Sequence, residues 1–436
     1  MTILLVIVFC LGYLAIVFEH QLEINKAAAA LVTGILCWTV LGTFQPAASE
    51  AGLMAPSGHT GNNFIAALPH HVVSAAEILF FLLGAMTIVE VIDAHKGFAI
   101  LTNRIRTRNI RQLLWIVGIA TFFLSAVLDN LTTAIVMASL IRKLIPGKEL
   151  RLTFAGAVII AANAGGAWSP IGDVTTTMLW IGGQISAEGI MRILILPSLV
   201  SLAIPLLWFT FKLKGQIPEV PFAETQVKAP KGANIFLLSG LGGLVLVPVF
   251  KTLTGLPPFM GVLLALGIVW LIADILHKKS EPETRKKYSA AEALSRTDTA
   301  SILFFFGILL AIGALETPGL LKNAAEWLNG SIGNQDVIVI AIGLLSAIID
   351  NVPLVAACMG MYDPALYQTD HKLWEFIAYC AGTGGSVLII GSAAGVAVMG
   401  MEKIDFGTYM KKISLPALVG YLAGAGAYLA LYSVIH

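Results

Sequence analysis

Ten apolar stretches of about membrane-spanning length run through the sequence, and they limit the chain to a polytopic membrane protein. A helix needs about 20 apolar residues to cross roughly 30 Å of hydrocarbon. The stretches that meet or approach this length are residues 2–18, 26–44, 73–94, 154–183, 190–213, 234–253, 257–277, 299–316, 374–400 and 414–435. Of the 436 residues 12% are charged, about half the share in a typical soluble chain. We therefore expect an all-α fold whose surface largely faces lipid.

The charge balance excludes several classes of function. The chain has 27 Lys and Arg residues against 26 Asp and Glu residues, whereas a nucleic-acid-binding surface needs a large basic excess. The apolar stretches leave no length for an extramembrane enzyme domain, so we expect neither an enzyme nor a cofactor. Four cysteines lie in apolar segments without metal-ligand spacing, and we interpret them as small buried side chains. They are Cys10, Cys37, Cys358 and Cys380.

Two shorter apolar segments are each interrupted near the centre by an Asp-Asn pair. The pair is Asp129-Asn130 in residues 113–141 and Asp350-Asn351 in residues 335–361. The arms on either side have about 13–15 residues and therefore reach only ~20 Å along a helix axis. Because a crossing helix is longer, these segments predict re-entrant hairpins with the Asp-Asn pairs at their tips.

Two of the long stretches also contain breaks. Residues 154–183 are interrupted at Gly165-Gly166, and residues 374–400 are interrupted at Gly384-Gly385. A helix break inside a membrane is tolerated only where the freed backbone groups face protein or a wet cavity. The two breaks therefore indicate a polar site within the membrane.

Basic residues predict how the chain is threaded, because cytoplasmic loops are rich in Lys and Arg. With Met1 outside, ten crossings and two returning hairpins, all but four of the 27 Lys and Arg residues fall on the inside. The four on the outside are Arg192, Lys251, Lys322 and Lys372. A hairpin that crossed completely would give the same asymmetry, so the short arms are what favour re-entrant hairpins.

The two halves of the chain resemble each other at an offset of about 220 residues. The segment Ser125-Ala-Val-Leu-Asp129-Asn130 recurs as Ser346-Ala-Ile-Ile-Asp350-Asn351, and the glycine pairs recur in the same order. We expect a first repeat over residues 1–214, a cytoplasmic linker over 215–233 and a second repeat over 234–436. Each repeat holds five crossing helices, one of which is broken, and one hairpin, and the odd number of crossings inverts the second copy. Inverted repeats with broken helices are typical of secondary transporters.

Three carboxylates remain at bilayer depth, where a charge is costly and therefore a functional candidate. Asp129 and Asp350 lie at the hairpin tips, and Asp173 follows the first glycine break, where the second copy has Ser392. If the interrupted elements meet at the midplane, their neutral side chains join one site. These are Asn130, Thr132, Thr133, Asn163, Thr175, Thr176, Asn351, Thr383, Ser386 and Ser392. Three carboxylates without Lys or Arg predict a cation site, with sodium held at Asp129, Asp173 and Asp350.

A purely structural interpretation stays open for these residues. Each of the three carboxylates could cap a helix, and the hydroxyl groups could bond to backbone carbonyls of their own helices. Glu90 and Asp93 share one helix face and are a candidate proton relay into the site. Glu375 and Glu402 lie near the ends of apolar stretches, where we expect solvated side chains.

The hairpin and break motifs together resemble the NhaD-type sodium/proton antiporters of the ion transporter superfamily, from about residue 73 to about residue 430. The motifs are Ser125-Ala-Val-Leu-Asp129-Asn130-Leu-Thr-Thr133, Ser346-Ala-Ile-Ile-Asp350-Asn351 and Asn163-Ala-Gly-Gly-Ala-Trp-Ser-Pro-Ile-Gly-Asp173-Val-Thr-Thr176. The resemblance implies the fold of the dicarboxylate/sodium symporters and a homodimer. It also implies exchange of sodium or lithium for protons across a bacterial inner membrane. The implied polar relay is Asp129, Asn163, Asp173, Thr175, Thr176, Ser346, Asn351 and Ser386.

The mechanistic hypothesis is competition of sodium and protons for the carboxylates. Burial favours the protonated form of a carboxyl group and a bound cation favours the ionised form. A sodium-coupled dicarboxylate symporter of the same fold is an alternative, although Asp129 and Asp350 would repel an anion. An intramembrane aspartyl protease using Asp129 and Asp173 is a more distant one. Its usual Gly-x-Gly-Asp motif is absent, because Pro170 stands in place of the first glycine.

Overall fold

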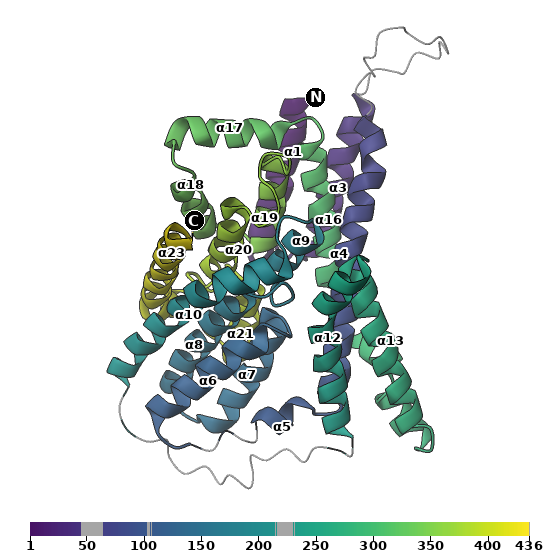
Figure 1. Cartoon of the computed structure of the whole chain (residues 1–436), viewed down its shortest axis with the longest axis vertical. Helices are drawn as coiled ribbons and strands as arrows, with labels where there is room; N and C mark the ends of the chain where they lie inside the picture. Colours follow the sequence, from purple (N-terminus) through teal and green to yellow (C-terminus); the bar gives the residue numbers. More distant parts are fainter. Residues whose placement is uncertain are drawn as a thin grey trace. The chain divides into compact units, whose positions relative to one another are not determined.

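A computed structural model describes residues 1–44, 64–102, 105, 107–213, 215, 230 and 232–435, which are almost entirely helical (Figure 1). These residues divide into two compact units. The first comprises Met1–Leu79, Asp298–Gly333 and Ala356–Leu366, and the second comprises Phe80–Thr297, Asn334–Val355 and Tyr367–His436. Helices α4 (Phe64–Ala94) and α19 (Asn351–Met361) contribute residues to both units. Most of the predicted linker 215–233 lies outside the described residues.

The first unit is organised around a close helix crossing. Its other helices are α1 (Thr2–Val17), α2 (Glu19–Leu22), α3 (Lys26–Thr43), α16 (Thr299–Glu316) and α17 (Leu320–Ile332). A Cβ atom on Gly34 would lie 2.5 Å from the carbonyl oxygen of Gly307, so α3 and α16 touch backbone to backbone. The indole Nε1 of Trp38 donates to the carbonyl of Leu310 at 2.9 Å. Small residues at such crossings are how membrane helices gain packing contacts.

The second unit contains the first predicted hairpin, both predicted broken helices and, from the second hairpin, α18 and the start of α19. The first hairpin is α6 (Ile110–Ser125) and α7 (Asn130–Leu144), and the first broken helix is α8 (Lys148–Ala167) and α9 (Val174–Ile181). The second hairpin is α18 (Gln335–Leu345) and α19, and the second broken helix is α20 (Lys372–Gly384) and α21 (Ala393–Glu402). The helix bounds confirm the predicted interruptions. Whether the hairpins are re-entrant stays a prediction.

The remaining helices of the second unit flank these elements. They are α5 (Phe98–Thr102), α10 (Ala187–Lys212), α12 (Ala233–Thr254), α13 (Pro258–Leu276), α14 (Pro282–Lys287), α15 (Ala290–Arg296), α22 (Phe406–Tyr409), the π-helix η1 (Met410–Ser414) and α23 (Leu415–Ile435). Helix α8 packs against α6 and α7, and α10 packs along α23 (Figure 1).

Eight helical segments among the described residues are long and apolar enough to cross a membrane. They are α3, Ile65–Ala94 of α4, α8, α10, α12, α13, α16 and the continuous run Phe406–Ile435. Helix α1 forms where residues 2–18 predicted a crossing, but its 16 residues make it a shorter apolar helix. The amphipathic helix α17 was not predicted.

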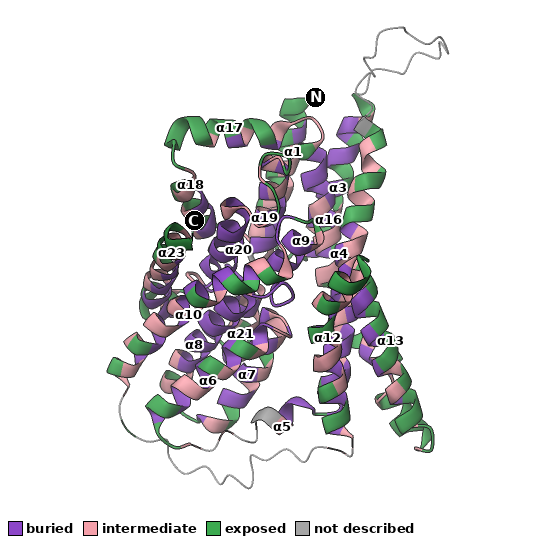
Figure 2. Cartoon of the chain, viewed as in Figure 1, coloured by how far each residue is buried: buried purple, intermediate pink, exposed green. Residues whose placement is uncertain are grey.

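The first halves of the two broken helices are more buried than the flanking helices α12 and α13. Figure 2 shows α8 and α20 largely buried, whereas α12 and α13 carry exposed faces. In a membrane such faces contact lipid, because they are apolar. Two expectations were wrong here: Glu375 and Glu402 are buried instead of solvated. The interpretation of the cysteines as buried holds for three of them, but Cys10 is exposed.

Candidate ion-binding site

The first hairpin turns at Asp129, whose carboxylate caps the following helix. Its Oδ1 accepts from the backbone N–H of Thr132 at 2.7 Å, and its Oδ2 accepts from the Thr132 hydroxyl at 2.8 Å. The backbone of Asp129 has a φ of 150°, a region that residues with a Cβ rarely adopt and that clusters at functional sites. The capping interpretation is therefore correct for Asp129, and the strained tip fixes the direction of the next residue, Asn130.

Asp173 is the buried carboxylate on which both hairpin tips converge. It caps α9, with Oδ1 accepting from the backbone N–H and the hydroxyl of Thr175, each at 2.9 Å. Its Oδ2 accepts from Nδ2 of Asn130 at 2.7 Å and from Nδ2 of Asn351 at 3.4 Å. The side chain is 2% exposed. The amides that follow Asp129 and Asp350 thus meet at a single carboxylate.

Asn163 connects this carboxylate with the second broken helix. Its Oδ1 accepts from Nδ2 of Asn130 at 3.0 Å, and its Nδ2 donates to the hydroxyls of Ser386 and Ser392, each at 2.9 Å. Asn163 is fully buried, and every polar atom of its amide has a partner. We refer to the connected set as the Asp173 network. It consists of Asn130, Asn163, Asp173, Thr175, Asn351, Ser386 and Ser392.

Equivalent hydrogen bonds in the two halves join each hairpin to the neighbouring broken helix. The hydroxyl of Ser125 donates to the carbonyl of Ala162 at 2.6 Å, and that of Ser346 donates to Ala381 at 2.9 Å. Both serines tie a hairpin arm to the helix that breaks beside it. The contacts support the predicted inverted repeat, although its division of the chain stays a prediction.

Glycines at the breaks allow an equally close approach in both halves. A Cβ on Gly165 would lie 2.2 Å from the carbonyl oxygen of Phe122, and one on Gly384 would lie 2.0 Å from that of Gly343. No side chain fits at such a distance from a backbone atom. The broken helices therefore need glycine at these two positions to touch the first arms of the hairpins.

The other predicted site residues have local partners. Thr176 and Thr383 donate to backbone carbonyls of their own elements, those of Asp173 and Tyr379. Asp350 is half-buried and accepts from the backbone N–H of Val352 at 3.2 Å. Thr133 differs, because its buried hydroxyl has no hydrogen-bond partner among the described residues.

Among the described residues no three His, Cys, Asp or Glu side chains lie together as ligands for one metal ion. Sodium coordination by Asp129, Asp173 and Asp350 jointly therefore stays a prediction. The proposed relay residues do not belong to the Asp173 network: Glu90 is half-buried and Asp93 is exposed on α4. Neither forms a hydrogen bond with that network in the part of the chain that the structure describes.

Two residues outside the network, one beside it and one at the far end of α21, were missed or misinterpreted. The hydroxyl of Tyr409, buried in α22, donates to the carbonyl of Ser386 at 2.8 Å and so supports the second break. Glu402, at the end of α21, is paired with two arginines from the first half of the chain. The Tyr409 contact spans 23 positions and the Glu402 contacts span more than 250, and no local pattern indicates either.

Known proteins match this chain over most of its length. A family model described as "Citrate transporter" (CitMHS) matches residues 13–374. The chain belongs to this family. "Sodium/proton antiporter 1" of Arabidopsis thaliana is 52% identical over 432 residues, covering 98% of this chain and 72% of the relative. "Na(+)/H(+) antiporter NhaD" of Vibrio cholerae serotype O1 is 30% identical over 456 residues, covering 98% and 91%. The resemblance to NhaD-type antiporters is therefore confirmed.

A solved structure shares the fold. The Alcanivorax borkumensis YdaH transporter, described as having an unusual topology, matches with a TM-score of 0.55 at 12% identity, covering 94% of this chain and 98% of that one. The family and this fold confirm an all-α, multi-pass membrane protein of a transporter class, not an enzyme.

Proposed function

We infer that the chain exchanges sodium for protons across a membrane, and that the two ions compete at Asp173. The observation that carries the inference is the convergence of Asn130 and Asn351, one from each hairpin tip, on this buried carboxylate. Relatives aligned with nearly the whole chain are named sodium/proton antiporters, which supports the same assignment.

A single buried carboxylate with hydrogen-bond donors around it suits competition between sodium and a proton. When no cation is bound, the amides of Asn130 and Asn351 and the hydroxyl of Thr175 can stabilise the ionised form by donating hydrogen bonds. A proton taken up by Asp173 removes the charge that a cation needs. Sodium and a proton would therefore exclude each other, and one would leave as the other binds.

Neutral oxygens near Asp173 can complete a sodium site. An Asn amide presents either its Nδ2 donor or its Oδ1 acceptor, depending on how it is turned about its last bond. Asn130 and Asn351 can thus serve the free carboxylate as donors and the bound cation as carbonyl ligands. The buried hydroxyl of Thr133, three residues beyond Asn130, has no hydrogen-bond partner in the described part of the chain and supports a ligand at this place. Hard cations favour such oxygen ligands.

The citrate named in the family description is a poorer match to the site. A tricarboxylate needs Lys or Arg side chains to balance its charge, whereas the Asp173 network contains none. Asp173 itself would repel the anion. The residues at the network therefore favour a cation over a dicarboxylate or citrate.

Several finer features belong to this proposal. Alternating access would move the hairpins and broken helices of repeats 1–214 and 234–436 between the two sides. Lithium as a second substrate, a homodimer and a bacterial inner membrane follow from the NhaD resemblance. The NhaD relative is bacterial, while sodium/proton antiporter 1 is a plant protein, so the host membrane is a separate question.

Purified protein in liposomes with an internal pH-sensitive dye tests the function. We expect an imposed sodium gradient to move protons in the opposite direction, lithium to do the same, and potassium to have no effect. Sodium-dependent uptake of radiolabelled citrate without proton exchange would contradict the proposal and favour the symporter.

A further inference from the structure

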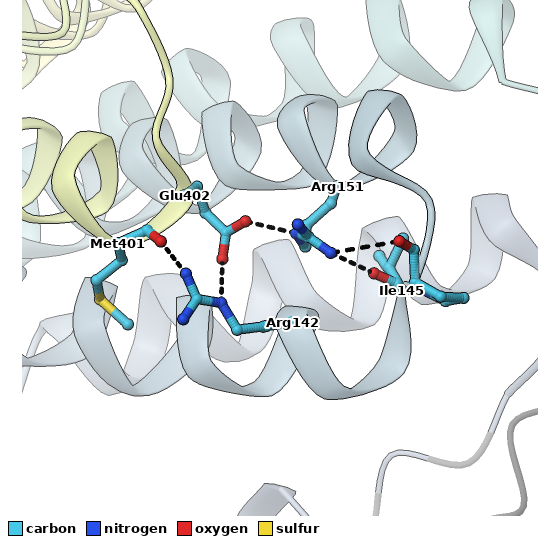
Figure 3. A network of polar contacts seen from close by, with 6 residues as sticks. Arg142, Ile145, Arg151, Met401 and Glu402 are labelled. Carbon is cyan, nitrogen blue, oxygen red and sulfur yellow. Dashed lines mark hydrogen bonds and ion pairs between the residues drawn. The ribbon is translucent and has the colours of Figure 1, made fainter.

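The C-terminal end of α21 carries a buried carboxylate held by two arginines (Figure 3). Oε1 of Glu402 accepts from Nε of Arg142 at 3.0 Å, and Oε2 accepts from Nε of Arg151 at 2.5 Å. The Glu402 side chain is 3% exposed, compared with 51% for Arg142 and 20% for Arg151. We call these three residues the Glu402 clamp.

The arginines of the clamp also hold backbone carbonyls around it. Arg142, in the last turn of α7, donates to the carbonyl of Met401. Arg151, near the start of α8, donates to the carbonyls of Ile145 and Pro146 at 3.2 and 3.4 Å. The clamp therefore joins the end of α21 to α7, α8 and the turn between them. Charge-assisted bonds of this kind are short and directional.

Helix α21 has the clamp at one end and the Asp173 network at the other. Ser392, whose hydroxyl accepts from Asn163, caps the start of this helix, and the helix ends at Glu402. Ten helical residues separate these ends by about 15 Å. A short helix moves as one body, so a displacement at Glu402 also displaces Ser392.

Ser392 is one of two hydroxyl acceptors that hold the amide of Asn163 in its orientation. Nδ2 of Asn163 donates to Ser386 and Ser392, and this leaves Oδ1 facing Asn130. If the Ser392 hydroxyl withdrew, the amide would lose one of these two acceptors and would be held less firmly with Oδ1 toward Asn130. Because Nδ2 of Asn130 also binds Asp173, the orientation of Asn163 affects the carboxylate directly.

The corresponding end of α9 is held by different contacts. The carbonyl of Gly183 accepts from the Thr369 hydroxyl at 2.6 Å, and that of Gln184 accepts from the N–H of Asp370 at 2.9 Å. Nζ of Lys251 donates to the carbonyl of Trp180 at 3.0 Å. These bonds all reach backbone carbonyls, whereas the α21 end is held by the buried charge of Glu402 as well as by the carbonyl of Met401. The ionic clamp thus lies on the helix that lacks a carboxylate at the site.

We propose that Glu402 is a positioning residue for ion binding: anchored by Arg142 and Arg151, it places α21 so that Ser392, at the start of that helix, helps to orient the amide of Asn163. This inference rests on the proposed sodium/proton exchange at Asp173. Glu402 touches no residue of the Asp173 network, so its effect passes through the helix.

The test is Glu402→Gln in proteoliposomes, with Glu149→Gln as the matched control. A glutamine has a single acceptor oxygen, so one arginine loses its partner. We expect the apparent KM for sodium to rise about ten-fold, the low end for groups that orient metal ligands, while the maximal rate stays within about two-fold. Glu149 pairs with Lys412 and its side chain is 86% exposed, so the control should leave the KM unchanged.

Hydrogen–deuterium exchange gives a second readout. Amides of Ala393–Glu402 should exchange faster in Glu402→Gln, while those of Val174–Ile181 should not change. If this variant does not fold, Glu402→Asp, which keeps the charge but is one methylene shorter, should still raise the sodium KM several-fold.

The outcomes separate the two proposals. Absence of sodium-driven proton movement in the wild-type protein would overturn the function. Normal exchange by the wild type, together with an unchanged sodium KM in a folded Glu402 variant, would overturn the positioning role alone. An equal rise in Glu149→Gln would also overturn it.

Discussion

The helices α9 and α21 start with the same backbone geometry but with different chemistry. The residue that caps α9, Asp173, has φ and ψ of −144° and 147°, and the residue that caps α21, Ser392, has −147° and 152°. Each side chain accepts from a backbone N–H in the first turn of its helix. The two halves therefore share the backbone geometry of the site, while only the first half supplies a buried carboxylate to it. We therefore expect packing substitutions to act equally in both halves and polar substitutions to act unequally.

The largest difference in sodium-driven proton movement is expected between Asp173→Asn and Ser392→Ala. Asparagine keeps the size of Asp173 but cannot carry the charge for which sodium and protons compete, so sodium-driven proton movement should fall to the background. Ser392→Ala removes a cap and one partner of Asn163, and exchange should continue with a sodium KM raised several-fold. Initial rates in proteoliposomes measure both. Undiminished exchange in folded Asp173→Asn would refute the assignment of the site.

An equal loss of stability is expected from Gly165→Ala and Gly384→Ala. The added methyl group would collide with a backbone carbonyl in each case, so each variant should lose about 1–3 kcal/mol of stability, as overpacking usually costs. Thermal unfolding in detergent compares them. Gly242→Ala is the control, because a Cβ there meets nothing within 4 Å. A large loss of stability in only one of the two variants would contradict the equal packing of the two halves.

A smaller difference, in the KM for sodium, is expected between substitutions of the two hairpin-tip amides, Asn130 and Asn351. Asn130 donates to Asp173 at 2.7 Å, while Asn351 donates at 3.4 and 3.5 Å. Hydrogen bonds to a charged group are among the stronger ones, so Asn130→Ala should raise the sodium KM about ten-fold and Asn351→Ala about three-fold. Titration of the exchange rate with sodium measures both. An Asn351→Ala effect as large as that of Asn130→Ala would contradict the account.

Local signals in the sequence predicted much of the fold. Asp-Asn pairs and paired glycines interrupt apolar runs, and helices end at those interruptions in the structure. The same approach missed α17, because its apolar residues recur around a helix face instead of forming a continuous run. Among its residues Trp327 is 69% exposed while Leu321 is buried.

The site itself was predicted as a set of residues, but the partners within it were not. In the Asp129-Asn130 pair the carboxylate turns to its own helix and the amide reaches Asp173. That choice depends on where the helix begins relative to the tip, which residue types alone do not determine. The burial of Glu402 depends on arginines more than 250 positions earlier in the chain. Such contacts follow from the packed fold.

The competition of sodium and protons at Asp173 is the central claim, and the pH dependence of sodium binding tests it most directly. The apparent KM for sodium should be measured by radioactive sodium uptake into proteoliposomes at a series of pH values. The account predicts that this KM rises as the pH falls, by about ten-fold per pH unit in the acid range, while the maximal rate at saturating sodium stays constant. A sodium KM that does not change with pH in the wild-type protein would contradict it.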